Sequence, residues 1–128
     1  MIEDRLLKIA SNTRYYGLKN NYTYKANLKN SKCGDKIAIE IILKRNIIKE
    51  LRYETEACIF CEASASTLAI IARNTKINVL KNDLNKYLNL DKKIPNKFRD
   101  LTYLLKEKYM NRKDCILLPF KAFYKAIK

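Results

Sequence analysis

The sequence predicts an α+β fold in which helices cover a three-stranded antiparallel sheet. Between residues 22 and 54, three segments alternate apolar and polar side chains, and short links join them. A period of two is typical of half-buried strands, and short links favour antiparallel neighbours. Elsewhere apolar residues recur at helical spacing. The 128 residues, of which 48% are hydrophobic, are enough for one folded core, so we expect a single domain over residues 1–128.

The N-terminal half should contain one helix followed by the sheet. The helix is expected over residues 2–17, with Gly17 at its end. The strands are expected over residues 22–29, 36–44 and 47–54. Because side chains alternate between the two faces of a strand, the third strand should direct three residues to the core: Ile47, Leu51 and Tyr53.

The C-terminal half should be helical. Helices are expected over residues 62–73, 80–88 and 97–108, with a break at Pro95. The first of them is rich in alanine and should close near Asn74. A last helix is expected from about Leu117, because Pro119 is tolerated in a first turn but not in a helix interior. This boundary places Cys115 just ahead of the last helix.

Charge and histidine content narrow the classes of function. The chain has 27 Lys and Arg against 13 Asp and Glu, a net charge of +14, which permits binding to nucleic acid or to an acidic surface. The lysines are spread along the chain, however, and most of the nine tyrosines fall on predicted apolar faces, so a nucleic-acid interface is not favoured. The sequence contains no histidine, which excludes hydrolytic triads and histidine–carboxylate metal sites.

The N-terminal sequence bears on the compartment. Residues 1–12 mix acidic and basic side chains, and no apolar run approaches the length of a membrane span. We therefore expect no signal peptide, no membrane partner and a cytoplasmic location. In that reducing compartment, the four cysteines are expected to be metal ligands or nucleophiles instead of disulfide partners.

Three of the cysteines fall at junctions between predicted elements. Cys33 lies between the first two strands, Cys58 between the third strand and a helix, and Cys115 ahead of the last helix. Helix N-termini stabilise thiolates through unpaired N–H groups and the positive end of the helix dipole. Gly34 permits a tight turn in which Cys33 and Asp35 can face one ion.

Cys61 is interpreted first as a packing residue. Phe60 and Ala63 flank it, and a buried cysteine behaves as a small hydrophobe. The second interpretation is an alternate metal ligand. Cys58 and Cys61 also form a CxxC, but a thioredoxin-like redox pair needs parallel crossovers that the predicted elements lack. A zinc module built from all four cysteines is a further interpretation, although the sequence lacks the second CxxC that would make it a strong signal.

Taken in order, the cysteine motifs resemble those of the U-type iron–sulfur scaffolds, the family of IscU, SufU and the N-terminal domain of NifU. The motifs are the Cys33-Gly34-Asp35 turn, the segment ACIFCEASAS at residues 57–66, and Asp114-Cys115 with a helix behind it. The resemblance runs from about residue 15 to residue 128 and is most specific over residues 31–68. It implies a SufE/NifU-like fold, with a three-stranded sheet covered by helices.

The resemblance also implies a site and partners. The ligands would be Cys33, Asp35, Cys58 and Cys115, holding a transient [2Fe–2S] cluster or Zn²⁺. A cysteine desulfurase would deliver a persulfide to Cys115 or to Cys33, and cluster-acceptor or carrier proteins would receive the product. General chemistry agrees, since thiolates suit both iron–sulfur clusters and zinc. One harder carboxylate ligand should make such a site more labile than an all-thiolate one.

Some positions depart from the family pattern. Ala57 stands where a glycine is usual, and Asp114 stands where IscU proteins have histidine. Asp114 is expected to cap the last helix, with a role as an alternate ligand as the second interpretation. Cys61 replaces a small, often hydroxylated residue. No LPPVK-type motif is present, so hand-off by a dedicated chaperone is not supported.

Three functions follow from these observations. The leading one is a non-enzymatic scaffold that receives sulfur and iron, builds a cluster and passes it on. The alternative is an enzyme, a SufU-like zinc-dependent sulfurtransferase that relays persulfide. The least favoured is a zinc-containing nucleic-acid-binding domain. A paralogue that kept the fold and lost cluster building is also compatible with the sequence.

Overall fold

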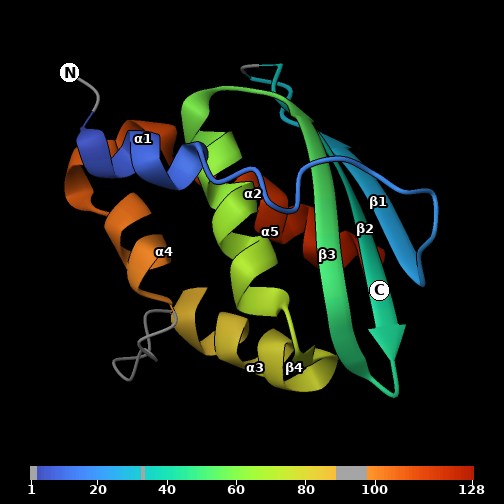
Figure 1. The fold of residues 1–128 in the computed structure, drawn as a ribbon. Helices are drawn as coiled ribbons and strands as arrows, with labels where there is room; N and C mark the ends of the chain where they lie inside the picture. The colour runs from blue at the N-terminus through green and yellow to red at the C-terminus, as the bar shows by residue number, and fades with distance from the viewer. Residues whose placement is uncertain (1–2, 33, 89–97) are drawn as a thin grey trace.

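The protein folds into a sheet with helices packed on one of its faces (Figure 1). The structure is a computed structural model that describes residues 3–32, 34–88 and 98–128. In chain order the elements are α1 (Asp4–Ala10), β1 (Tyr24–Lys29), β2 (Lys36–Lys44), β3 (Ile47–Glu56), α2 (Ile59–Ala72), β4 (Thr75–Lys76), α3 (Ile77–Leu88), α4 (Arg99–Leu104), the 3-10 helix η2 (Glu107–Arg112) and α5 (Lys113–Ala126). The expected α+β class is confirmed.

The sheet has the strand order β1-β2-β3-β4, and every neighbouring pair is antiparallel. The three expected strands are present, and β3 continues to Glu56, past its expected end at residue 54. The sheet has a fourth strand that was not predicted. β4 contains only 2 residues, which pair with Ile47 and Ile48 of β3. Two residues are too few to show an alternating pattern.

A β-bulge determines which face of β3 is buried at its start. The register shifts after Ile42, so that Leu43 lies opposite Ile48 and Lys49 has no opposite residue. The extra residue reverses the face to which the preceding side chains point. Ile48 is therefore fully buried and Ile47 only partly buried. The expectation that Ile47 faces the core with the rest of the strand was wrong, because strict alternation takes no account of a bulge.

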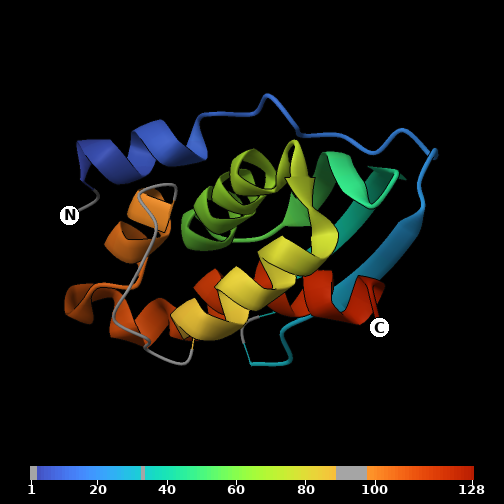
Figure 2. The same ribbon diagram turned by 90° about the horizontal axis from the view of Figure 1, so that it is seen from below.

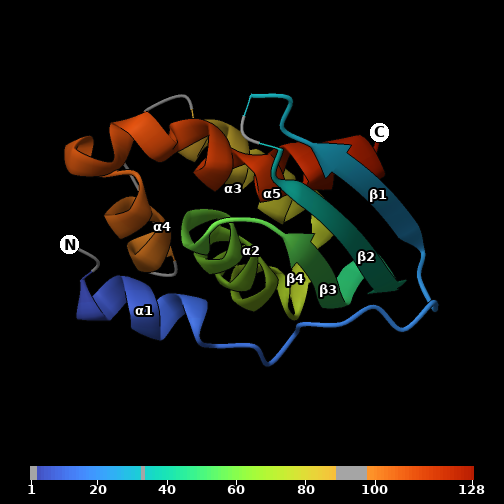
Figure 3. The ribbon, with the colours of Figure 1, turned by 90° about the horizontal axis from the view of Figure 1, so that it is seen from above.

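Two helices, α2 and α5, pack on each other and on the inner face of the sheet. Figures 2 and 3 show them side by side, with the C-terminal half of α5 next to β1. The core between these layers includes the fully buried side chains of Ile39, Leu51, Leu68, Ile116 and Phe123. The two helices therefore bring segments that are distant in sequence to one end of the sheet.

The N-terminal helix is shorter than expected. α1 ends at Ala10, and residues 12–23 form an extended strap that crosses in front of the sheet in Figure 1. The strap pairs with the edge of β3, where the N–H of Gly17 donates to the carbonyl of Tyr53 at 2.8 Å. The prediction of a helix through Gly17 was wrong. Hydrogen bonds to the sheet satisfy the backbone groups of the strap, and a helix without tertiary contacts is only marginally stable.

Glu40 holds the strap against the outer face of the sheet. Its carboxylate is fully buried and accepts the N–H groups of Lys19 at 2.9 Å and Asn20 at 3.2 Å. Arg52 adds hydrogen bonds to the carbonyls of Gly17 at 2.6 Å and Tyr16 at 2.8 Å. The two faces of the sheet are thus covered differently, by helices on one side and by a hydrogen-bonded strap on the other.

The remaining helices follow the sequence with shifted ends. α2 begins at Ile59, earlier than the expected residue 62, and the chain leaves it through Asn74, whose φ of 59° is left-handed. α3 covers the helix expected over residues 80–88 and starts earlier. The helix expected over 97–108 is divided into α4 and η2. The break expected at Pro95 lies outside the described residues.

The start of α5 corrects the prediction for the C-terminal helix. α5 begins at Lys113 and contains Pro119 in its interior. Proline has no N–H to donate to the carbonyl of Cys115, four residues earlier. The helix nevertheless continues, because its apolar face is buried against α2 and the sheet. Cys115 therefore lies in the first turn of α5 and not ahead of the helix.

Candidate metal centre

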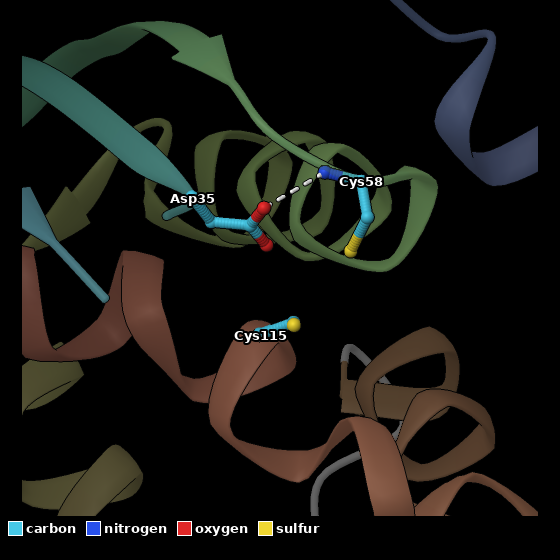
Figure 4. A group of neighbouring side chains, drawn as sticks. All are labelled: Asp35, Cys58 and Cys115. Atoms are coloured by element: carbon cyan, nitrogen blue, oxygen red, sulfur yellow. Dashed lines mark hydrogen bonds between the residues drawn. The ribbon is translucent and has the colours of Figure 1, made fainter. Parts of the chain in front are cut away.

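Three side chains from distant segments meet at one end of the sheet. Asp35 lies directly before β2, Cys58 directly before α2, and Cys115 in the first turn of α5. One ligand atom from each residue lies within 4.8 Å of the corresponding atoms of the other two. Figure 4 shows the two sulfurs and the carboxylate directed toward a common gap. The structure thus brings together three of the four residues that the sequence resemblance implied.

The turn before β2 places Asp35. The N–H of Gly34 donates to the carbonyl of Asn30 at 2.8 Å, and the N–H of Asn30 donates to the carbonyl of Asp35 at the same distance. Gly34 has a φ of 77°, a left-handed conformation that costs little only for glycine. Cys33 belongs to this turn in the sequence, but it lies outside the described residues.

The carboxylate of Asp35 has one satisfied oxygen and one that is not. Asp35 is only 7% exposed, and its Oδ1 accepts the backbone N–H of Cys58 at 3.3 Å. Its Oδ2 is buried and has no hydrogen-bond partner among the described residues. A buried anionic oxygen without a donor is unfavourable unless a cation or a proton satisfies it. A metal ion bound by this oxygen and the two neighbouring thiols would satisfy it.

Both described cysteines of the site lie at helix N-termini. Cys58 is the N-cap residue of α2, and Cys115 is the third residue of α5. The unpaired N–H groups and the positive dipole end of each helix favour negative charge there. Cys115 is 5% exposed, whereas Cys58 is partly exposed and nearer to solvent. Two thiolates and one carboxylate form a donor set suited to zinc or to iron in an iron–sulfur cluster.

The two alternate ligands do not join this group. Cys61 lies inside α2, fully buried in the core, so packing accounts for its position. Asp114 lies in the first turn of α5, where its carboxylate is exposed and 3.5 Å from Lys32 Nζ. Asp114 is also not the cap that was expected, because the N-cap residue of α5 is Arg112. The earlier start of the helix moves Asp114 into the helix itself.

Two serines of the segment 57–66 have positions that the sequence analysis did not predict. Ser64 is fully buried, and its hydroxyl donates to the Ile116 carbonyl, which ties α2 to α5 one residue beyond Cys115. The hydroxyl of Ser66 donates to the Asn12 carbonyl at 2.8 Å and ties α2 to the strap. Small hydroxyl residues inside an apolar helix were a signal for such contacts, but their partners were not predictable.

A comparison with protein families gives a match over almost the whole chain. The family described as "NifU-like N terminal domain" matches residues 1–126. A scaffold protein of Thermotoga maritima, "Iron-sulfur cluster assembly scaffold protein IscU", is 25% identical over 132 aligned positions, which cover 100% of this chain and 93% of that protein. An uncharacterized protein of Borreliella burgdorferi is 35% identical over 118 residues, with 80% of this chain and 77% of that protein covered.

Solved structures share the fold. The N-terminal NifU-like protein from Brucella abortus superposes with a TM-score of 0.81 at 22% identity, covering 98% of this chain and 90% of that chain. A putative scaffold protein for the SUF system from Fervidobacterium islandicum gives a TM-score of 0.81 at 20% identity, covering 99% and 96%. None of the described helices has the length and apolarity of a membrane-spanning segment.

The chain belongs to the family of NifU-like N-terminal domains, the U-type scaffold family that its cysteine motifs resemble.

Proposed function

We propose that this protein is a scaffold for iron–sulfur cluster assembly, and that the cluster is its cargo. The observation that carries the proposal is the meeting of Cys58, Cys115 and Asp35 within 4.8 Å, with one carboxylate oxygen buried and unpartnered. Cys33 is the fourth proposed ligand. This set would hold a [2Fe–2S] cluster transiently, because one of its four ligands is a carboxylate and not a thiolate.

Sulfur would arrive as a persulfide on a cysteine desulfurase. A thiolate of this protein, Cys33 or Cys115, attacks the outer sulfur of that persulfide. A new S–S bond forms on the scaffold, the S–S bond of the donor breaks, and the donor cysteine leaves as a thiolate. Reducing the transferred sulfur to sulfide needs two electrons from a separate thiol or protein reductant. Thiols must stay reduced for this chemistry, which is in keeping with the proposed cytoplasmic location.

The partly exposed side of the site would face the partners. Cys58 is partly exposed, whereas Cys115 is 5% exposed. A desulfurase and a cluster-acceptor or carrier protein would approach the site from the side of Cys58. Mass analysis after incubation with the desulfurase and cysteine would identify the acceptor, because only the accepting thiol gains one sulfur atom. Cys33→Ser and Cys115→Ser distinguish the two candidates.

Metal and sulfide analysis tests the scaffold directly. Protein purified without oxygen and supplied with ferrous iron and sulfide should become coloured, with sulfide-to-iron charge-transfer bands and equal amounts of iron and acid-labile sulfide. Cys58→Ala should abolish both. Cys61→Ala is the matched control, since Cys61 lies on the same helix but points into the core, and it should keep them. Colourless wild-type protein that carries only zinc contradicts the scaffold proposal.

The second candidate is a zinc-dependent sulfurtransferase of the SufU kind. The same donor set favours it, because two thiolates and a carboxylate oxygen are also common ligands of tetrahedral zinc. Desulfurase turnover separates the two functions. A relay enzyme would contain zinc and would accelerate turnover of the desulfurase catalytically. The Cys33→Ala variant of a relay enzyme would no longer accelerate it. A scaffold would accumulate labile sulfide together with iron.

A further inference from the structure

We infer that Tyr109 is a positioning residue of the metal centre, which holds the N-terminal ends of α2 and α5 at the separation that Cys58 and Cys115 need. The inference rests on the proposed function, since it assigns a role within the same site. Tyr109 is not one of the proposed ligands, which include Cys58 and Cys115. It acts through the elements that carry them.

The ring of Tyr109 connects the two helix starts. Tyr109 belongs to η2, which runs directly into α5, and its backbone angles (φ −109°, ψ 15°) depart from helical values at a kink. Its ring lies 5.0 Å from the ring of Phe60 in an edge-to-face arrangement. Phe60 is the second residue of α2 and follows Cys58 by two positions. Edge-to-face contacts of this kind are favourable and depend on geometry.

A second contact joins the same two helix starts. The guanidinium carbon of Arg112 lies 5.7 Å from the centroid of the Phe60 ring. Arg112 is the N-cap residue of α5, three positions before Cys115. Phe60 therefore contacts the segment ahead of α5 at two residues, Tyr109 and Arg112. A change in the position of Tyr109 should shift the start of α5 relative to the start of α2.

The hydroxyl of Tyr109 is held on two sides. It donates to Oε1 of Glu3 at 2.9 Å and shares a hydrogen bond of 3.2 Å with the hydroxyl of Tyr103, in which either oxygen can be the donor. The ammonium of Lys108 pairs with the same oxygen of Glu3. The hydrogen bond with Tyr103, followed by burial, raises the pKa of Tyr109 to about 12, so it remains a donor at neutral pH. The residue preceding α1 thus fixes the ring that orients both cysteine-bearing helices.

Metal binding should be sensitive to this arrangement. Zinc–thiolate bonds are about 2.3 Å long, and the ligands must be placed accurately to share one ion. Residues that orient ligands from outside typically change metal affinity by about 10–100-fold when removed. Tyr109 acts one step further from the ligands, so we expect the lower end of that range, about tenfold.

Cobalt(II) is a suitable probe for the test, because thiolate-to-cobalt charge-transfer bands and d–d bands report the geometry of the site. The full chain is titrated with Co²⁺ alone, without oxygen, in competition with a chelator. Tyr109→Phe keeps the ring and removes the hydroxyl. We expect about tenfold weaker Co²⁺ binding and altered d–d bands, and a larger loss for Tyr109→Leu, which also removes the ring contact.

Two variants separate positioning from general stability. Tyr124 lies in α5, after Pro119. Tyr124→Phe removes a hydroxyl that donates to Asn85 Oδ1 at 2.7 Å. It should bind Co²⁺ like the wild type even where its unfolding temperature falls as much as that of Tyr109→Phe. Glu3→Gln keeps an acceptor oxygen for Tyr109 and should retain affinity, whereas Glu3→Ala should not.

The outcomes are distinct. Wild-type affinity and unchanged bands in Tyr109→Phe overturn the positioning role while leaving the metal centre intact. Equal losses in Tyr109→Phe and Tyr124→Phe also overturn it, because they show a general effect of stability. Wild-type protein without thiolate-to-cobalt bands overturns the proposed metal centre and the positioning role with it.

Discussion

The backbone N–H of Cys58 donates a hydrogen bond of 3.3 Å to Oδ1 of Asp35. This bond joins the start of α2 to the turn before β2, so one proposed ligand orients another. It also occupies only one carboxylate oxygen and leaves Oδ2 facing the gap without a partner among the described residues. The relationship explains why a carboxylate is suited to this position, since an apolar residue there would leave the N-cap N–H unsatisfied.

Replacing Asp35 by cysteine should make the site hold its metal more tightly. The variant has an all-thiolate ligand set, which suits iron–sulfur clusters and zinc better than a mixed set. We expect cluster or Co²⁺ loss to a chelator to slow by about tenfold. Absorbance at the charge-transfer bands after chelator addition measures the rate. Asp35→Asn, which keeps an oxygen for the Cys58 N–H, is the control and should lose metal faster than the wild type.

Cys61→Ala should affect stability but not metal content. Cys61 is fully buried within α2, and removing its sulfur leaves a small cavity that costs about 1 kcal/mol. Urea unfolding of the metal-free protein gives the stability, and metal analysis gives the stoichiometry. A loss of metal in Cys61→Ala that equals the loss in Cys58→Ala would show that Cys61 is a ligand.

Gly34→Ala should weaken both the fold and the site. A Cβ at Gly34 meets no atom within 4 Å, so the cost comes from the backbone φ of 77° alone, about 1–2 kcal/mol. Gly17 is a matched control, because its φ of 105° is also positive and a Cβ there lies 3.9 Å from Arg52 Nη2. Both alanine variants should lower the free energy of unfolding, measured by urea titration. Only Gly34→Ala should also reduce Co²⁺ affinity, since Gly17 is on the strap.

Acid should remove part of the stability of the outer face of the sheet. The hydrogen bond from Arg52 Nη1 at 2.7 Å is the main cause that lowers the pKa of Glu50 below its ordinary value of 4.5. A lowered pKa in the folded state means that the unfolded chain binds the proton more readily. The contribution of Glu50 is therefore complete above pH 4.5 and disappears as the pH falls through the lowered value.

Glu50→Gln tests this dependence. The wild type should be more stable than Glu50→Gln at neutral pH, and the difference should shrink below pH 4.5. Urea unfolding at several pH values measures it. Glu56→Gln serves as the control, because Glu56 is exposed on the same strand and its contact with Lys36 is 3.9 Å long. A stability difference for Glu50→Gln that does not change with pH contradicts the assignment.

Much of the fold was predictable from local sequence. Alternation identified β1, β2 and β3 because their side chains face the core at a period of two. Helical spacing and alanine content identified α2, and Asn74 marked its end. The misses occurred where tertiary contacts outweigh local preference. Burial keeps Pro119 inside α5, the sheet holds the strap in an extended form, and Lys49 is an extra residue in the ladder.

The sequence by itself determined the types of ligand and their local settings. Cys33 is followed by Gly34, Cys58 comes shortly before an alanine-rich segment, and Cys115 follows Asp114, and each of these motifs is a local feature of the sequence. Only the tertiary structure decided that Asp35, Cys58 and Cys115 share one gap and that Cys61 and Asp114 do not. Their separation depends on how α2 and α5 pack on the sheet. That packing comes from long-range burial and from contacts such as Tyr109 with Phe60, which no local pattern specifies.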